Sequence, residues 1–178
     1  MAQSLSLSLL IVSVLPSSGT FPECLKLGFM VQEVQTIFGR MEPMEEIPHD
    51  CILTLPPIGF THNMSLGAAA AVMDKVFSET IRLYRKKCRQ LGGTRKDCSE
   101  LLHLLHQLRH RVAPCLTDTG EYKEVMELIL EHFKQQRWMA RNRGNAACAR
   151  HIIWMANAQN YRQVARLTSL MIKQRLMN

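Results

Sequence analysis

The chain has 178 residues, which suits one domain with a sizeable core. Aromatic residues make up only 6%, eleven residues are methionine, and β-branched runs with clean alternation are missing, which argues against a sheet-based fold and predicts an all-α one. The formal net charge of +7 is compatible with nucleic acid, heparin-like glycans or membrane surfaces as partners, and also with a solvated basic surface that binds nothing.

Residues 1–19 carry no charged side chain, and Leu5 to Leu15 is an apolar run broken only by serines. Ser17 and Gly19 place small residues at −3 and −1 of a cut before Thr20, so we expect 1–19 to be a secretory signal peptide and 20–178 the mature, secreted domain. The run is too short to span a membrane, so we expect no membrane insertion; a buried or interfacial segment is the alternative. In a secreted protein the nucleic-acid partner loses weight; a solvated basic surface is the favoured explanation of the charge, and weak glycosaminoglycan binding stays open.

Helical periodicity and punctuation predict five helices in chain order. Their expected ranges are Cys24–Arg40, Leu66–Lys87, Asp97–Ala113, Glu121–Trp138, and Asn145 to the C-terminal region. Prolines at 43, 48, 56 and 57 exclude a helix between the first two, where apolar anchors and a cysteine predict an ordered connection. Ser65 is a plausible N-cap for the second helix, and Asn63-Met64-Ser65 is a glycosylation sequon.

The last helix begins with the stretch Asn145–Gln159. Four residues in it follow the i, i+4, i+7, i+8 spacing of a buried face: Cys148, Ile152, Met155 and Ala156. Met155 also fits an exposed role. The residues that fall largely off this stripe are Arg150, His151, Trp154, Asn157 and Gln159. This pattern predicts a helix that is buried on one side and presents a recognition surface on the other.

Six cysteines follow the predicted cleavage site, and an even number in an oxidising context predicts disulfides. The pairing is not settled by the sequence, although Cys88 and Cys98, joined through Gly92-Gly93, suggest a local staple. Zinc would need close pairs, and the chain has none. Three histidines share one helix face and could hold a metal, but a solvated face is the commoner explanation, so we expect no metal or cofactor: His103, His106 and His110.

Short loops favour antiparallel neighbours, whereas a long connection between the first two helices lets them run parallel. The expected architecture is therefore an up-up-down-down helical cytokine bundle of five helices, disulfide-bonded, with a long connection between helices one and two. No nucleophile–base set, phosphate-binding loop or paired-carboxylate motif stands out, so an enzyme is not expected.

The chain resembles the type I interferons of vertebrates. Cys24 opens the first helix, Cys51 lies in the long connection, Cys115 ends the third helix and Cys148 begins the last, an order similar to that of the family's four cysteines. Cys148-Ala149 also matches the start of the family's last helix. Further similarity lies in two short stretches, Ile152-Ile153 and Pro56-Pro57-Ile58-Gly59-Phe60.

The resemblance implies the pairings Cys24–Cys115 and Cys51–Cys148, with Cys88–Cys98 as an extra bridge. It implies a surface for the high-affinity chain of a heterodimeric class II cytokine receptor, formed by Ile52, Leu55, Trp154, Met155, Ala158, Gln159 and Arg162. The opposite face, on the second and third helices and part of the fourth, would take the second receptor chain. A monomer of this kind would trigger Janus kinase and STAT signalling in innate antiviral defence.

Two other functions stay open. Type III interferons and other helical cytokines share the bundle, and receptor identity would separate them from type I. A protein of another class, an intracellular basic helical protein that binds nucleic acid, would retain Met1 and have free thiols.

Overall fold

The computed structural model describes residues 24, 26–49, 51, 55–56, 58–59, 64–116, 122–142 and 146–177. Within these ranges the chain is all-helical and has no strand, as the composition predicts. The elements are α1 (Gly28–Arg40), α2 (Leu66–Lys87), α3 (Arg95–Val112), a short 3-10 helix η2 (Ala113–Cys115), α4 (Lys123–Met139) and α5 (Ala146–Met177). No helix of the described ranges is long and apolar enough to cross a membrane.

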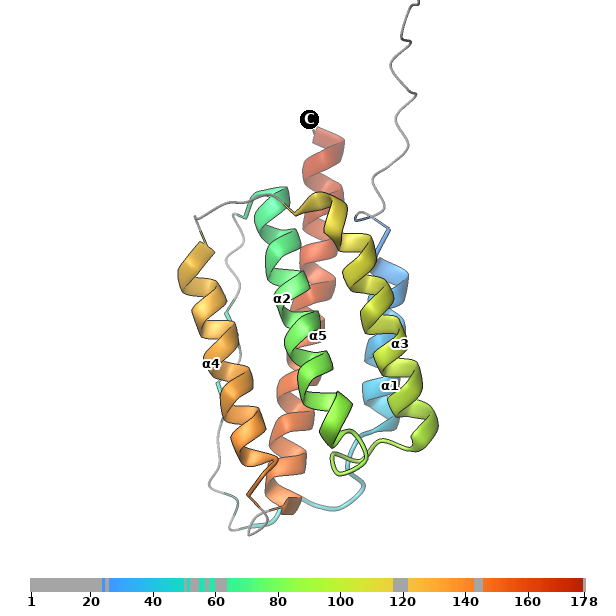
Figure 1. The fold of residues 1–178 in the computed structure, drawn as a ribbon, viewed down its shortest axis with the longest axis vertical. Coiled ribbons are helices and arrows are strands. Elements are labelled where there is room, and N and C mark those ends of the chain that lie inside the picture. The colour runs from blue at the N-terminus through green and yellow to red at the C-terminus, as the bar shows by residue number, and fades with distance from the viewer. Residues whose placement is uncertain are drawn as a thin grey trace, which may run out of the picture.

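The helices lie roughly along one axis, and α5 runs through the middle of the bundle (Figure 1). The chain descends in α1, α2 and α4 and ascends in α3 and α5 in this view. α1 packs against α3 and α5, whereas α2 packs against α3, α4 and α5. α4 lies on the far side of α2 from α3 in the view, so it closes one flank of the bundle.

Two helix starts have clear local causes. The Ser65 hydroxyl accepts a hydrogen bond from the Ala68 amide at 3.3 Å, so the expected N-cap of α2 is confirmed. At α3 Thr94 and Asp97 form a capping box, which starts the helix two residues before the predicted position. The Thr94 hydroxyl lowers the pKa of Asp97, and the nearby Arg40 guanidinium adds to this effect.

The first helix begins later than expected, at Gly28 instead of Cys24. Cys24 is fully buried in a disulfide, and the described residues 24, 26 and 27 precede the α-helix. In the first turn of the helix Phe29 is 71% exposed, whereas Met30 and Val31 are buried. The remainder of the buried face of the helix consists of Val34, Ile37 and Phe38.

The centre of the core is a cluster of four aromatic rings from α1, α2 and α5. The ring centroid of Phe38 lies 5.5 Å from that of Tyr84 and 5.2 Å from that of Tyr161, and Tyr161 stacks on Phe77 at 6.1 Å. All four side chains are almost fully buried. These ring contacts set the positions of α1, α2 and α5 relative to one another along the bundle axis.

All six cysteines are paired. Cys24–Cys115 and Cys51–Cys148 are the two long-range pairings that the resemblance implies. Cys88–Cys98 is the expected local staple. Bridges of this kind are typical of an oxidising compartment.

The buried face of α5 differs from the predicted stripe. Cys148 and Ala156 are buried as expected, but Met155 is 38% exposed and Ile152 is only partly buried. His151 and Asn157, which were expected off the stripe, are buried instead. Both have hydrogen-bond partners that offset the cost of removing polar groups from water, so the apolar pattern alone misplaces this face.

The turn between α2 and α3 leads to a testable consequence at Gly93. A Cβ atom there would lie 2.7 Å from the Sγ atoms of both Cys88 and Cys98, which the disulfide holds in place. We expect Gly93→Ala to lower the free energy of unfolding by about 2 to 3 kcal/mol, because neither sulfur can move away. Guanidinium unfolding followed by circular dichroism measures this change.

Gly39→Ala is the matched control, since nothing lies within 4 Å of a Cβ at that position in α1. It should leave the protein as stable as before, or more stable by up to about 1 kcal/mol through helix propensity. Equal stability of the two variants would contradict the close packing of Gly93.

Candidate functional site

Two described residues of the connection between α1 and α2, Glu45 and Cys51, lie against the N-terminal half of α5. The disulfide Cys51–Cys148 joins the connection to the helix covalently across 97 residues of chain. The Arg150 guanidinium forms an ion pair with the Glu45 carboxylate. Connection and helix therefore form one unit.

A buried histidine provides the third link. His151 Nε2 lies 2.6 Å from the Glu45 carbonyl oxygen, and Nδ1 lies 3.1 Å from the Ala147 carbonyl oxygen of the preceding turn. Both ring nitrogens thus face backbone carbonyl oxygens, and the shorter contact is the one to Glu45. His151 was expected to face outward, but its position holds the connection on α5.

Trp154 joins α5 to the end of α1. Its indole N–H donates to the Phe38 carbonyl oxygen at 2.8 Å, in the last turn of α1. The side chain is half-buried. Trp154 is therefore a link between helices as well as a partly accessible aromatic surface.

The exposed side chains of this unit come from both segments. On α5, Met155 and Arg162 are exposed. On the connection, Met44 is fully exposed and Ile47 is 45% exposed, and they lie on either side of Glu45, which α5 holds in place. Met44 was not among the residues selected from the sequence, and the signal that could have found it is an apolar residue between Pro43 and Pro48 in a cysteine-anchored connection.

The other predicted surface residues have mixed positions. Ala158 and Gln159 are half-exposed on α5. Leu55 is partly buried against the core, and Pro56, Ile58 and Gly59 line a hollow together with residues of α4. Ile52 and the sequon residue Asn63 lie outside the described residues, as does the predicted signal peptide. The described contacts from the connection to α5 are those of Glu45 and Cys51.

A buried polar network holds the later part of the connection. The side-chain amide nitrogens of Gln136 and Asn160 lie 2.8 and 3.0 Å from His132 Nε2, an arrangement that favours a proton on Nδ1. The ring also forms a hydrogen bond with the backbone of Pro56. Asn157 Nδ2 donates to Gln136 Oε1 at 2.8 Å. The network therefore joins α4, α5 and the connection around a histidine that is 6% exposed.

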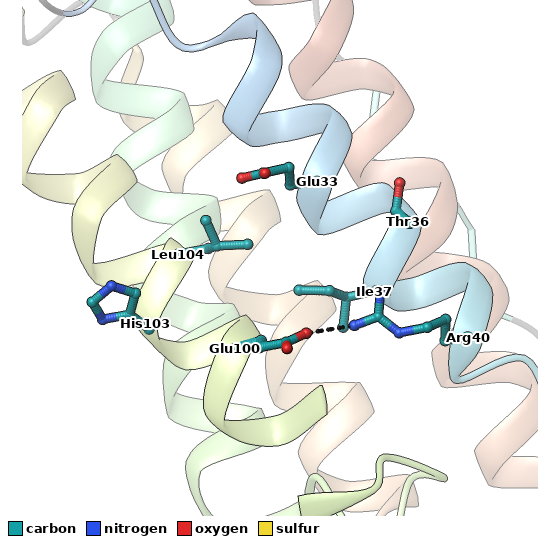
Figure 2. A pocket seen from close by; sticks show the side chains of 7 residues that line it. All are labelled: Glu33, Thr36, Ile37, Arg40, Glu100, His103 and Leu104. Carbon is teal, nitrogen blue, oxygen red and sulfur yellow. Dashed lines mark hydrogen bonds and ion pairs between the residues drawn. The ribbon is translucent and has the colours of Figure 1, made fainter. Parts of the chain in front are cut away.

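A hollow lies between α1 and α3 (Figure 2). It has a volume of about 420 Å³, and Arg40 closes its end by pairing with Glu100 at 2.6 Å and with Asp97 at 2.8 Å. Its lining mixes both charges with apolar side chains, and Figure 2 shows Leu104 and Ile37 near its centre. This groove offers neither a matched charge nor a nucleophile with a base, so it is a weaker candidate than the α5 surface.

The three histidines considered for a metal are all exposed on α3, and the ring of His103 contacts the side chain of Gln107. Within the described ranges no group of three or more His, Cys, Asp or Glu side chains could hold a metal ion.

Trp154→Phe removes the hydrogen bond to the Phe38 carbonyl oxygen while keeping most of the apolar ring. We expect the free energy of unfolding to fall by about 1 to 2 kcal/mol. Arg162→Ala serves as the control on the same helix, because an exposed side chain away from such contacts should change stability by less than about 0.5 kcal/mol. Equal effects would show that the indole contact contributes nothing to holding α1 on α5.

His132 makes stability depend on pH. Burial lowers its pKa from 6.5 to about 4, so the unfolded chain binds more protons than the folded one between these values. The free energy of unfolding should therefore fall as pH decreases from about 6.5 to about 4. His132→Gln, which cannot titrate, should flatten the pH profile in this window, measured by urea unfolding; an unchanged profile would contradict the buried neutral ring.

No protein-family model, curated protein or solved structure matches the chain. The resemblance to type I interferons rests on the cysteine order and the short motifs of this chain alone.

Proposed function

We propose that the protein is a secreted helical cytokine of the type I interferon kind. It binds the two chains of a class II cytokine receptor and so starts Janus kinase and STAT signalling for antiviral defence. Its activity is binding, without catalysis, cofactor or metal, and it acts as a monomer.

The observation that carries this proposal is the disulfide framework. Cys51–Cys148 ties the α1–α2 connection to the start of α5, and Cys24–Cys115 ties the residues before α1 to η2, directly after α3. If Cys24, Cys51, Cys115 and Cys148 are counted as four, the first pairs with the third and the second with the fourth. This is the pairing of the family that the chain resembles. The helix directions support it too, since α1 and α2 run one way and α3 and α5 the other (Figure 1).

The high-affinity receptor chain would bind the α5 surface and the adjoining residues 44–47. Arginine and methionine are enriched in protein interfaces, and both are exposed here as Arg162, Met155 and Met44. Trp154 would contribute through the accessible part of its ring. The second receptor chain would bind the opposite side, on α2, α3 and part of α4.

Two rivals predict different results. A type III interferon or another helical cytokine would bind a different receptor ectodomain through the same kind of bundle. An intracellular nucleic-acid-binding protein would keep Met1 and would have no need for three disulfides. N-terminal sequencing of protein secreted from vertebrate cells, combined with disulfide mapping, separates this last rival from a cytokine.

The test uses immobilised ectodomains of type I and type III interferon receptors. Met155→Ala with Arg162→Ala should weaken binding to the high-affinity type I chain by about 10- to 100-fold, since a few central side chains dominate such interfaces. His106→Ala, at an exposed position on α3, should not change it. A STAT reporter in receptor-bearing cells should lose potency in parallel.

Two other outcomes are informative. If wild-type protein binds no type I ectodomain, the proposed function is wrong. If it binds but the α5 variant is unaffected, only the placement of the surface is wrong.

A further inference from the structure

A basic cleft lies between the C-terminal ends of α2 and α4. Its volume is about 470 Å³, and six of its seven lining residues are arginine or lysine. The lining residues are Arg82, Leu83, Arg85, Lys86, Lys87, Arg137 and Arg141. No acidic residue is among them, which sets this cleft apart from the mixed groove between α1 and α3.

The cleft is held together by contacts between the two helix ends. Gln90, just past α2, donates from Nε2 to the Ala140 carbonyl oxygen at the end of α4, at 2.8 Å. The Lys87 ammonium donates to Gln90 Oε1 at 3.0 Å, and the Arg141 guanidinium donates to the Arg137 carbonyl oxygen at 3.1 Å. The spacing of the cations is therefore set by the fold.

A buried carboxylate neutralises part of this charge. Glu79 is 4% exposed and forms an ion pair with Arg137, while Lys75 Nζ and Arg82 Nη1 each lie 3.9 Å from it. This carboxylate anchors Arg137 in the wall of the cleft. It leaves a large excess of positive charge at the rim, where Arg85, Lys86 and Arg141 are exposed.

Basic residues in a last helical turn are common, because they interact favourably with the carbonyl end of the helix dipole. That effect explains one or two cations at each helix end. It does not explain why cations from two helices meet around one hollow, where like charges repel. An anion with several charges, bound in the hollow, would remove this repulsion.

We propose that the cleft binds a sulfated glycosaminoglycan chain. Arginine and lysine provide charge-assisted hydrogen bonds to sulfate oxygens. A nucleic acid is disfavoured because no lining residue is aromatic, so bases would have nothing to stack on, and because three disulfides suit an extracellular environment. The cleft is separate from the α5 surface, and the proposal does not depend on receptor binding.

The experiment measures binding of the full chain to immobilised heparin over a series of salt concentrations. Arg85→Gln with Lys86→Gln removes two exposed cations from the cleft without introducing a negative charge at the helix end. The matched control, Arg166→Gln with Lys173→Gln, removes two exposed cations from α5, so both variants have the same net charge. Circular dichroism and disulfide mapping confirm that each variant folds.

We expect the cleft variant to bind heparin roughly tenfold more weakly near physiological salt, because it releases fewer counterions. The slope of log affinity against log salt should fall by about 2, one for each lost contact, as for phosphate contacts to nucleic acids. The control should keep the wild-type slope and affinity within about twofold.

Three outcomes would overturn the proposal. Equal losses in both variants would mean that net charge alone drives binding. Undiminished binding of the cleft variant would place the site elsewhere. Tighter binding to a single-stranded DNA oligonucleotide than to heparin at equal salt, lost in the cleft variant, would assign the cleft to nucleic acid.

Discussion

The disulfide between Cys51 and Cys148 is the constraint on which the rest of the candidate surface depends. It closes a loop of 97 residues, and in the chain-entropy account a loop of about that length is worth about 4 to 5 kcal/mol to the folded state. Weaker contacts then act in its vicinity: the Arg150 ion pair with Glu45 and the His151 hydrogen bond to the same residue. An exposed ion pair alone contributes about 0 to 1 kcal/mol, too little to order a connection containing four prolines.

The position of α5 also depends on hydrogen bonds, because its buried face carries polar side chains. His151, Asn157 and Asn160 are at most 5% exposed, and each would be costly to bury without a partner. The partners come from elsewhere in the chain: a carbonyl oxygen of the connection for His151, and Gln136 and His132 of α4 for the two asparagines. Because these bonds form only in one arrangement of α4, α5 and the connection, they favour that arrangement over others of similar apolar burial.

These polar contacts also explain which parts of the structure the sequence predicts. The bounds of α2 are predicted to the residue, since Ser65 is a strong local cap and its alanines favour helix. The Cys88–Cys98 staple is predicted because the glycines between them leave only a short turn. The buried face of α5 is not predicted from the sequence. The spacing of apolar residues assigns His151 and Asn157 to the surface, because their hydrogen-bond partners lie 106 and 21 residues away in the chain. The exposed Met44 is missed for a related reason, since its neighbourhood depends on where α5 holds Glu45.

The connections from α2 to α3 and from α3 to α4 explain how the C-terminal ends of α2 and α4 come to lie at the same end of the bundle. α2 ends at Lys87 and α3 begins at Arg95, so the chain must reverse there, and it reverses again between Val112 and Lys123. Two reversals make α2 and α4 parallel, and both helices place basic residues at their C-terminal ends, where the helix dipole favours them. The dipole thus selects the residue type at each end, and the topology brings the two ends together. Together these effects account for one or two cations at each helix end, whereas six arginine and lysine side chains line the cleft.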